Sequence, residues 1–312
     1  MESPVVGCLL GTAIGDALGL PLEGLNRRRA EKLFPGPVRH RLILGRGFSS
    51  DDTEHTIMVL QAYWASPDDP ERFAREYARR LMGWMLMLPA AAGLATLKAG
   101  VRLLVGVPPS RSGVRSAGNG AAMRSAILGV VISDPEQRTR FVDACARVTH
   151  TDDRAIEGAR LVALAAASTP ADDAFWRAAA ALAKHPEWDL TSVRRGELPK
   201  GPVSGYVIST VHAALACWVR HPNDYFAAIT EAIELGGDTD TVGAIVGGIV
   251  GASAGVPPSL LKGYAEWPRG EDWLRRLAAG PVRTNWAAVL LRNALFLFVV
   301  LGHGFRRLLP PY

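Results

Sequence analysis

Cysteine is scarce in this chain of 312 residues, which contains only Cys8, Cys145 and Cys217. An odd number of cysteines without paired or ligand-type spacing predicts neither a disulfide framework nor a zinc cluster. Charged residues make up only 21% of the chain and apolar residues 48%, so a large core can form and disorder is not expected. We therefore expect a globular protein of a reducing compartment, the cytoplasm.

The sequence also lacks a secretion signal and a concentrated basic patch. The apolar stretch from residue 4 to 22 follows Glu2 rather than a basic region and contains Asp16, so we do not interpret it as a signal peptide. The net charge of +5 is spread over short arginine runs at 27–29, 79–80, 194–195 and 306–307. Such runs are more typical of solvated faces than of a nucleic-acid interface, and no nucleic-acid partner is expected.

Alternating strand patterns are rare, and helical periodicity dominates. Apolar residues recur at helical spacing at Ile57, Leu60 and Trp64, and alanine-rich runs follow at 90–97, 155–168 and 174–183. Turn residues separate these segments without a long linker. The sequence predicts an all-α protein, a compact single-domain orthogonal helical bundle. Residues 1–275 form the main domain in this prediction, and residues 276–312 form an apolar C-terminal tail helix.

Glycines at four-residue spacing mark the helix expected from Thr241. Gly243, Gly247, Gly251 and Gly255 leave one face of this helix without side chains, so another element has to pack closely against it. In a membrane the spacing would indicate helix dimerisation. Because the helix follows an acidic loop, a core helix surrounded by neighbours is the favoured interpretation.

The tail has a character of its own. Residues 286–301 are strongly apolar, but Arg292 and Asn293 interrupt them, and a spanning helix requires roughly 20 mostly apolar residues. A helix that docks on the core or on a dimer partner is the favoured interpretation. The alternative is peripheral membrane contact through this segment together with Arg306 and Arg307.

Two acidic clusters each precede a helical pattern. The first is the segment 50–53 (Ser-Asp-Asp-Thr), and the second is 236–241 (Gly-Gly-Asp-Thr-Asp-Thr). The first has a structural interpretation, because Asp51 and Glu54 are spaced like a capping box. Capping explains two such crowded clusters less well, because adjacent carboxylates repel each other and some would have to stay protonated.

A divalent cation would remove this repulsion. Carboxylate and hydroxyl oxygens, with no histidine or cysteine in either cluster, favour Mg²⁺ or Mn²⁺ over zinc. Two clusters fit two ions, which lie about 3.5–4 Å apart in a catalytic pair. The sequence thus predicts a binuclear metal cleft with two divalent cations as cofactors.

Five motifs follow one another along the chain: Gly15-Asp16-Ala17-Leu18-Gly19 with Glu23, then Asp51-Asp52-Thr53, Ser116-Ala117-Gly118-Asn119-Gly120-Ala121-Ala122-Met123-Arg124, Thr149-His150 and Gly236-Gly237-Asp238-Thr239-Asp240-Thr241. In order and spacing they resemble the motifs of the ADP-ribosylglycohydrolase family, over about residues 5–265. The resemblance implies an all-helical fold with two Mg²⁺ or Mn²⁺ ions at the base of a cleft. The implied metal ligands are Ser50, Asp51, Asp52, Asp238, Asp240 and Thr241. At position 50 serine replaces the more common threonine and keeps the hydroxyl.

The resemblance also implies a substrate site. The implied substrate-binding residues are Ser116, Gly118, Asn119, Gly120, Met123 and His150. Glycines let backbone N–H groups approach phosphates, although an isolated Asn-Gly pair suits a plain turn equally well. A lone histidine such as His150 is also often structural. Glu23 matches a glutamate on a mobile loop over the metals, whereas Asp152 and Asp153 are more typical of a helix start.

These features predict a metal-dependent hydrolase that removes ADP-ribose from a modified acceptor, with protein arginine as the first candidate. The metal pair would hold the distal ribose and lower the pKa of a water, and Asp52 or Glu23 would guide the proton past an oxocarbenium-like state. Three alternatives remain: a non-catalytic relative that binds ADP-ribose, a hydrolase of a small metabolite such as O-acetyl-ADP-ribose, and a phosphohydrolase that cuts the pyrophosphate.

Overall fold

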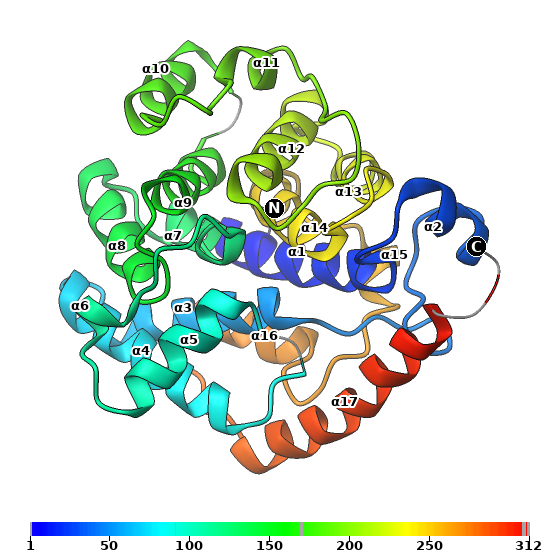
Figure 1. Ribbon diagram of the computed structural model, residues 1–312, viewed down its shortest axis with the longest axis horizontal. Helices are drawn as coiled ribbons and strands as arrows, with labels where there is room; N and C mark the ends of the chain where they lie inside the picture. The colour runs from blue at the N-terminus through cyan, green and yellow to red at the C-terminus, as the bar shows by residue number, and fades with distance from the viewer. Residues whose placement is uncertain (1, 91, 169–170, 308–309, 311–312) are drawn as a thin grey trace.

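The computed structural model describes residues 2–90, 92–168, 171–307 and 310, and in this part of the chain all regular secondary structure is helical (Figure 1). The elements of the first half are α1 (Pro4–Gly19), η1 (Leu20–Leu22), α2 (Arg27–Leu33), α3 (Asp51–Ala65), α4 (Pro70–Leu86), α5 (Leu94–Leu104), α6 (Pro109–Ser112), η2 (Asn119–Ala121), α7 (Ala126–Val131) and α8 (Pro135–Arg147). Those of the second half are α9 (Asp153–Ala166), α10 (Asp173–Leu182), α11 (Leu190–Arg194), α12 (Val207–Arg220), α13 (Tyr225–Glu234), α14 (Thr239–Ala254), α15 (Pro258–Leu261), α16 (Glu271–Ala279) and α17 (Trp286–Arg307). The prediction of an all-α, single-domain protein is confirmed.

Two of the three alanine-rich runs are helical nearly as predicted, in α9 and α10. The run at 90–97 is helical only from Leu94. Pro89 and Gly93 lie before this point, and both residue types disfavour a helix interior. Ala91 lies outside the described residues. The segment before α5 is therefore a loop, and part of it reaches the site described below.

Helices α1 and α14 run antiparallel through the centre of the molecule and touch through their backbones (Figure 1). A Cβ atom added to Gly11 would lie 2.0 Å from the carbonyl oxygen of Gly247, and one added to Gly15 would lie 2.0 Å from that of Gly243. The bare face of α14 therefore packs on an equally spaced glycine row in α1, as a core helix. Gly255 is the exception, because it follows the end of α14 with a φ of 71°.

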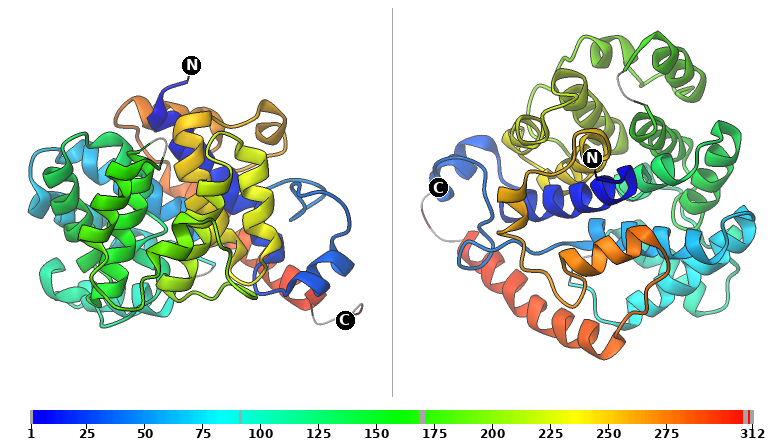
Figure 2. Two further views of the ribbon diagram at one scale, coloured as in Figure 1. Left: turned by 90° about the horizontal axis from the view of Figure 1, so that it is seen from above. Right: turned by 180° about the vertical axis from the view of Figure 1, so that it is seen from behind.

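The C-terminal end of α1 is where the two acidic clusters meet. Asp16 accepts a hydrogen bond from the N–H of Ser50, the residue that caps α3. Thr239, the first residue of α14, donates its hydroxyl to the carbonyl of Gly19. Helices α7, α9, α12, α13 and α16 surround the central pair (Figure 2). The close packing of α3 and α14 on α1 thus brings distant parts of the sequence together.

Among the residues that the structure describes, two helices are long and apolar enough to cross a membrane by length and composition alone. One is the segment Pro4–Leu22, of which 83% is buried in the protein, so α1 is a core helix. The other is Trp286–Arg306, of which only 22% is buried. This second segment is α17, which lies along the outside of the molecule (Figures 1 and 2). Residues 308, 309, 311 and 312 of the predicted tail lie outside the described part.

Polar contacts fix α17 to the protein. The guanidinium of Arg292 donates two hydrogen bonds to the carboxylate of Glu266, at 2.9 and 2.6 Å, and one to the carbonyl of Ser49 at 2.7 Å. Both charged side chains are buried. Asn293 donates to the carbonyl of Met87 at 2.8 Å. The polar pair that interrupts the apolar tail therefore faces inward and contacts the residue just before the first acidic cluster.

Candidate active site

A cavity of about 410 Å³ lies where the two acidic clusters meet. Its lining comprises Glu23, Asp51, Asp52, Ala92, Gly93, Leu94, Ala95, Thr96, Ser116, Gly118, Asn119, Gly120, Met123, His150, Gly205, Asp238, Asp240 and Thr241. With one exception, all residues predicted to bind metal or substrate line this cavity. The exception is Ser50, which is buried directly behind it and donates its hydroxyl to Asp52 at 3.1 Å.

Asp16 holds the first acidic segment in place. Its carboxylate accepts hydrogen bonds from the N–H of Ser50 at 3.0 and 2.9 Å, from the N–H of Thr53 at 3.2 Å and from the Thr53 hydroxyl at 2.5 Å. Burial raises the pKa of Asp16 to about 7, and these hydrogen bonds oppose the rise. Asp16 thus bonds to the residue before Asp51 and to the residue after Asp52, and so fixes the start of α3 with both carboxylates at the cavity.

The carboxylates at the cavity destabilise one another. Burial is the main cause that raises the pKa values of Asp51, Asp52 and Asp240 well above their usual range, and the neighbouring carboxylates, including Glu23, add to it. Thr241 donates its hydroxyl to Oδ2 of Asp52 at 3.3 Å. The other carboxylate oxygen of Asp52, Oδ1, is buried without a hydrogen-bond partner among the described residues. The site thus concentrates negative charge that its own donors do not fully satisfy.

The capping interpretation of the first cluster is only partly right. Ser50 caps α3, and its Oγ accepts from the N–H of Asp52 at 3.3 Å. Glu54 does not complete a capping box with Asp51. Its carboxylate instead pairs with Arg269 and accepts a hydrogen bond from the Trp84 indole at 2.6 Å. Asp51 is therefore free of a capping role and lines the cavity.

The second acidic segment is shaped by its glycines. Gly236 and Gly237 have φ angles of 72° and 85°, a left-handed conformation that favours glycine. A Cβ atom on Gly237 would also lie 2.0 Å from the carbonyl oxygen of Val203. Asp238 then caps the N-terminus of α14 without a side-chain capping bond and accepts a hydrogen bond from Asn119 at 2.6 Å. The tight turn therefore presents this carboxylate to the cavity.

Glu23 lies on a tethered segment. Its neighbour Gly24 donates to the carbonyl of Gly237 at 2.6 Å, and the N–H of Gly237 donates to the carbonyl of Leu25 at 2.8 Å. The negative charge of Glu23 contributes to the raised pKa values of Asp51 and Asp240. A carboxylate thus stands at the cavity on the segment that links α1 to the second acidic cluster.

The segment 116–123 is built differently from a simple phosphate loop. The N–H of Gly118 donates to Oγ of Ser116 and that of Asn119 donates to the carbonyl of Gly205, so two backbone donors are already used. A short 3₁₀ turn, η2, follows instead of a full α-helix. A Cβ atom on Gly120 would lie 3.0 Å from the His150 ring. The glycine at this position therefore lets the histidine approach the cavity wall.

His150 is a neutral hydrogen-bond donor at this wall. Burial and the charge of Arg124 lower its pKa to about 3. Arg124 donates to Oγ1 of Thr149 at 2.7 Å, and the same oxygen is 2.8 Å from Nδ1 of His150. The Thr149 hydroxyl also donates to the carbonyl of Ala146 at 3.4 Å, so it connects Arg124, the backbone and the imidazole, whose Nε2 lies next to Gly118.

Asp152 and Asp153 begin a helix, as their spacing predicted. Asp152 caps α9 by accepting from the N–H of Arg154, and it forms an ion pair with the same residue at 2.8 Å. Asp153 is the first residue of α9. Neither residue lines the cavity. Their carboxylates therefore belong to the helix start and not to the acidic site.

The match to known proteins covers almost the whole chain. A model of the ADP-ribosylglycohydrolase family matches residues 1–291. The chain belongs to the ADP-ribosylglycohydrolase family. The family membership that the five motifs predicted is thus confirmed, and each motif contributes at least one residue to the lining of the cavity.

Individual relatives extend this result. An uncharacterized protein of Archaeoglobus fulgidus is 32% identical over 300 residues, which cover 89% of this chain and 95% of that protein. The ADP-ribosylarginine hydrolase Tri1 of Pseudomonas putida is 29% identical over 300 residues, 87% of this chain and 75% of that protein. A solved structure described as an ADP-ribosylglycohydrolase-related protein complex has a TM-score of 0.69 at 28% identity and covers 94% of this chain and 98% of that one.

The donor set of this family member suits hard divalent cations. It consists of carboxylate and hydroxyl oxygens, and Oδ1 of Asp52 is a buried acceptor without a partner in the described part of the chain. As the side chains stand, no three His, Cys, Asp or Glu side chains of the described residues are arranged around one ion position. The chemistry of the site fits a cation, and Asp52 and Asp238 also accept hydrogen bonds from Ser50, Thr241 and Asn119.

Several residues of the site were not assigned a role by sequence reasoning. Asp16 stood in a recognised motif, but its partners are backbone groups more than thirty positions away. The segment 92–96, which comprises the end of a loop and the first turn of α5, lines one wall of the cavity and carries no chemical signature, because its members are small or apolar apart from Thr96. Gly205 likewise lies next to Asp238 through a turn that only the fold reveals.

Proposed function

We propose that this protein is a metal-dependent ADP-ribosylhydrolase that cleaves the glycosidic bond between ADP-ribose and a modified acceptor, with protein arginine as the preferred acceptor. The observation that supports this proposal is the meeting of both acidic clusters, the segment 116–123 and His150 around one cavity. Its volume of about 410 Å³ is in the range of small-molecule sites. One end of the cavity is acidic, and the other offers neutral donors to the nucleotide.

The reaction requires stabilisation of positive charge on the distal ribose. Cleavage of a glycosidic bond passes through an oxocarbenium-like state, so carboxylates beside the sugar ring favour the transition state. Asp52 has a free carboxylate oxygen, Oδ1, that can take a proton from the attacking water. Glu23 is the second candidate for this role, because it lines the same cavity. Nε2 of His150, at the same wall, hydrogen-bonds to the nucleotide part.

Two Mg²⁺ or Mn²⁺ ions, held by Ser50, Asp51, Asp52, Asp238, Asp240 and Thr241, would supply positive charge to anchor the ribose hydroxyls and to acidify a water molecule. The chain's own residues prepare for this charge. Asp16 orients Asp51 and Asp52, and Asn119 orients Asp238. The pKa values of these carboxylates are raised by burial and by repulsion between their negative charges, and divalent ions would relieve both effects.

The acceptor is proposed by similarity, because the roles assigned to the cavity residues concern only the ADP-ribosyl end of the substrate. The Pseudomonas putida relative is named for the hydrolysis of ADP-ribosylarginine. A non-catalytic ADP-ribose-binding protein and a hydrolase of a small metabolite such as O-acetyl-ADP-ribose share the same cavity chemistry. A defined panel of arginine-, serine- and acetyl-linked substrates distinguishes these functions.

The test measures release of ADP-ribose by chromatography with each substrate, with Mg²⁺ or Mn²⁺ and with EDTA. We expect release from the arginine-linked substrate with metal and loss of release with EDTA. Asp52→Ala and Asp240→Ala should each reduce kcat/KM by two orders of magnitude or more, about 3 kcal/mol. The exposed Asp68→Ala is the matched control. Wild-type turnover in both site variants, or AMP as the product, would refute the proposal.

We also propose a cytoplasmic location. The three cysteines are separate, buried and free, and none forms a disulfide. Burial raises the pKa of Cys8 to about 12, so its thiol stays protonated. Fractionation of cells that express the protein tests the location, and recovery from an extracytoplasmic fraction would contradict it.

A further inference from the structure

The outward face of α17 is a continuous apolar stripe. Leu291, Leu295, Phe298, Leu301 and Phe305 follow one another at spacings of three or four residues, so they share one side of the helix. All five side chains are exposed, and Phe298 is 72% exposed. We call these five residues the outer stripe. At 1.5 Å per residue the helix of 22 residues is about 33 Å long, so the stripe is a large uncovered apolar surface.

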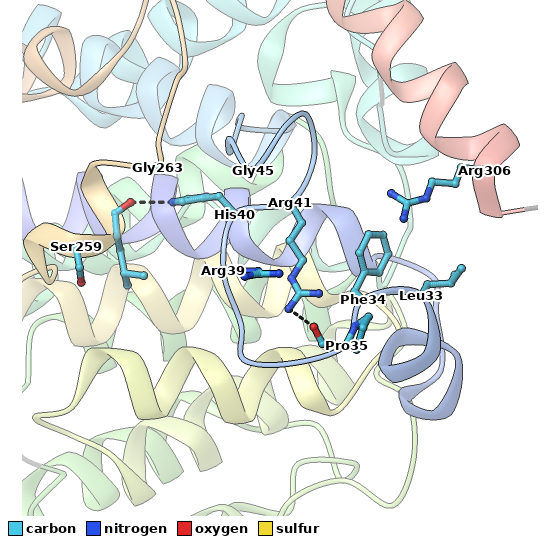
Figure 3. A pocket seen from close by; sticks show the side chains of 11 residues that line it. Leu33, Phe34, Pro35, Arg39, His40, Arg41, Gly45, Ser259, Gly263 and Arg306 are labelled. Carbon is cyan, nitrogen blue, oxygen red and sulfur yellow. Dashed lines mark hydrogen bonds between the residues drawn. The ribbon is translucent and has the colours of Figure 1, made fainter. Parts of the chain in front are cut away.

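The segment of sequence that contains α17 is basic. Residues 273–312 contain six arginines and neither aspartate nor glutamate. Next to the C-terminal end of α17 a cavity of about 610 Å³ is lined by Arg39, Arg41 and Arg306 (Figure 3). The guanidinium carbons of Arg306 and Arg41 lie 5.0 and 6.0 Å from the ring centre of Phe34. We call this cavity the arginine pocket.

The arginine pocket has no counter-charge of its own. No carboxylate of the described residues lies within 4.0 Å of Arg39, Arg41 or Arg306. Arg41 donates instead to three backbone carbonyls of the segment 35–37. Burial and the charge of Arg39 lower the pKa of Arg41, which shows that the two cations disfavour each other. An anion placed between them would relieve this repulsion. The side chain of Arg307 lies outside the described part.

A second apolar anchor stands beside the helix. Ile43 and Arg46 close a two-residue turn with Leu44 and Gly45 at its tip, both at positive φ. Asparagine usually occupies the first position of such a turn, because a side chain on this backbone is strained. Leu44 is nevertheless present there and 97% exposed. Ile43 and its neighbour Leu42 pack in the same apolar cluster as Phe296, so the turn lies against α17.

We infer that this face docks on an anionic phospholipid membrane. The outer stripe enters the boundary between headgroups and acyl chains, and the arginine pocket takes the phosphate of an anionic headgroup. A helix with an apolar face and basic flanks lies in the plane of a membrane for these two reasons. Leu44 adds an apolar contact at the same end as the pocket.

Two other occupants fit the surface less well. A second copy of the chain would bring two carboxylate-free, arginine-rich segments together, and like charges oppose such an interface. A spanning orientation would require α17 to leave the protein. Its inward face is held by the buried Arg292–Glu266 pair and by Asn293, so the helix lies on a membrane rather than across it.

The experiment is flotation of the purified full chain with vesicles of phosphatidylcholine alone and with about one-quarter phosphatidylglycerol. We expect binding to the anionic vesicles, weakened by high salt and released by alkaline carbonate. Phe298→Glu should weaken binding by about tenfold or more, since it replaces an inserted aromatic side chain by a charge. Arg39→Ala with Arg306→Ala should reduce the affinity for anionic vesicles by roughly tenfold or more.

Phe226→Glu on α13 is the matched control, because it changes an exposed phenylalanine away from this face. Its binding should equal that of the wild type. Melting temperature and ADP-ribose release are measured for every variant to show that the fold is intact. Failure of the wild type to bind anionic vesicles overturns the inference. So does equal binding of Phe298→Glu, resistance to carbonate, or a dimer that Phe298→Glu dissociates without any vesicle binding by the wild type.

Discussion

Thr149 links a fully buried cation to the histidine at the cavity wall. Its hydroxyl accepts from Arg124 and lies 2.8 Å from Nδ1 of His150, so it holds the imidazole ring in its position at the wall. Replacement by valine keeps the shape but removes the hydroxyl partner of Nδ1 of His150, whereas the guanidinium keeps its bonds to Gly120 and Cys145. This is a positioning role, because Thr149 itself does not line the cavity.

We therefore expect Thr149→Val to lower kcat/KM for ADP-ribose release by about tenfold or more, the cost of one unsatisfied buried polar group. Thr149→Ser keeps the hydroxyl and should retain most of the activity. The measurement is steady-state kinetics on the arginine-linked substrate, with melting temperatures as the control of folding. Equal losses in both variants would mean that the methyl packing, and not the hydroxyl, matters.

Removal of one negative charge from the acidic site should not destabilise the protein when metal is absent. Asp240 is buried beside Asp52 and Glu23, and asparagine keeps an oxygen for the hydrogen bond that Asp240 accepts from the N–H of Thr241. In EDTA, Asp240→Asn should therefore be as stable as the wild type or more stable, by about 1 kcal/mol or roughly 2–4 °C. With Mn²⁺ the wild type should gain stability and the variant should gain much less.

Thermal unfolding followed by fluorescence, in EDTA and in Mn²⁺, checks this prediction. The exposed Asp68→Asn serves as the control and should respond to Mn²⁺ as the wild type does. If the wild type shows no shift with Mn²⁺ or Mg²⁺, the cation site is refuted, whatever the stability of the variant.

At the residue level the predicted site residues other than Ser50 line one cavity, and their roles as metal ligands and substrate contacts stay predictions. The sequence did not predict the role of Asp16. The bonds from Ser50 and Thr53 depend on how α3 crosses α1, and a sequence pattern within one helix contains no information on that crossing. The hydrogen bond from Asn119 to Asp238 was not predicted either, because it also depends on how distant segments pack.

Helix α14 illustrates what periodicity reveals at the level of elements. Its glycine spacing predicted a close neighbour, and the structure identifies that neighbour as α1. The pairing was not predicted, although Gly7, Gly11, Gly15 and Gly19 have the same spacing, because most of these positions were attributed to an apolar helix or to a family motif. Matching rows of glycine on two separate segments are the signal that would have predicted the contact.

Gly247→Ala should therefore disturb the centre of the protein. The added methyl would meet the carbonyl oxygen of Gly11 at 2.1 Å, and neither backbone can move without the other helices. We expect a loss of about 3 kcal/mol or more in unfolding free energy, at or above the upper end of overpacking in cores. The effect should extend to catalysis, because α1 and α14 carry Asp16 and Asp240.

Gly302→Ala is the matched control, since this glycine lies in α17 with no atom within 4 Å of the added methyl. A glycine-to-alanine change in an open helix position should be neutral or stabilising by up to about 1 kcal/mol. Urea unfolding of both variants decides the matter. Similar stabilities of the two variants would show that α1 and α14 are not in backbone contact.

The molecule contains two kinds of buried titratable group, and acidification changes the unfolding free energy in opposite directions through them. His150 has a pKa of about 3 and His55 has a pKa well below the usual range, both because of burial, so protonation of either ring is disfavoured in the folded state. The buried carboxylates have raised pKa values and shift stability in the opposite direction. The pH dependence of the wild-type stability is thus the sum of the histidine and carboxylate contributions. A variant that removes one group isolates the contribution of that group.

His150 makes the folded protein less stable as the pH falls, because its proton binds more tightly in the unfolded chain. In the unfolded chain a histidine binds its proton near pH 6.5, whereas the folded protein holds His150 neutral down to about pH 3. Between these values the unfolded state binds one more proton, so this group lowers the unfolding free energy by about 1.4 kcal/mol for each pH unit of acidification. Above pH 6.5 it contributes no slope.

His150→Gln removes this contribution and leaves the carboxylates, Arg124 and Asp152 in place. Between pH 6.5 and 5 the wild type should therefore lose about 2 kcal/mol more unfolding free energy than the variant does, whatever their stabilities at neutral pH. Urea titrations at several pH values measure the two slopes. Parallel slopes would mean that His150 is protonated in the folded protein, and a cationic ring beside Arg124 would then be available to bind the phosphates directly.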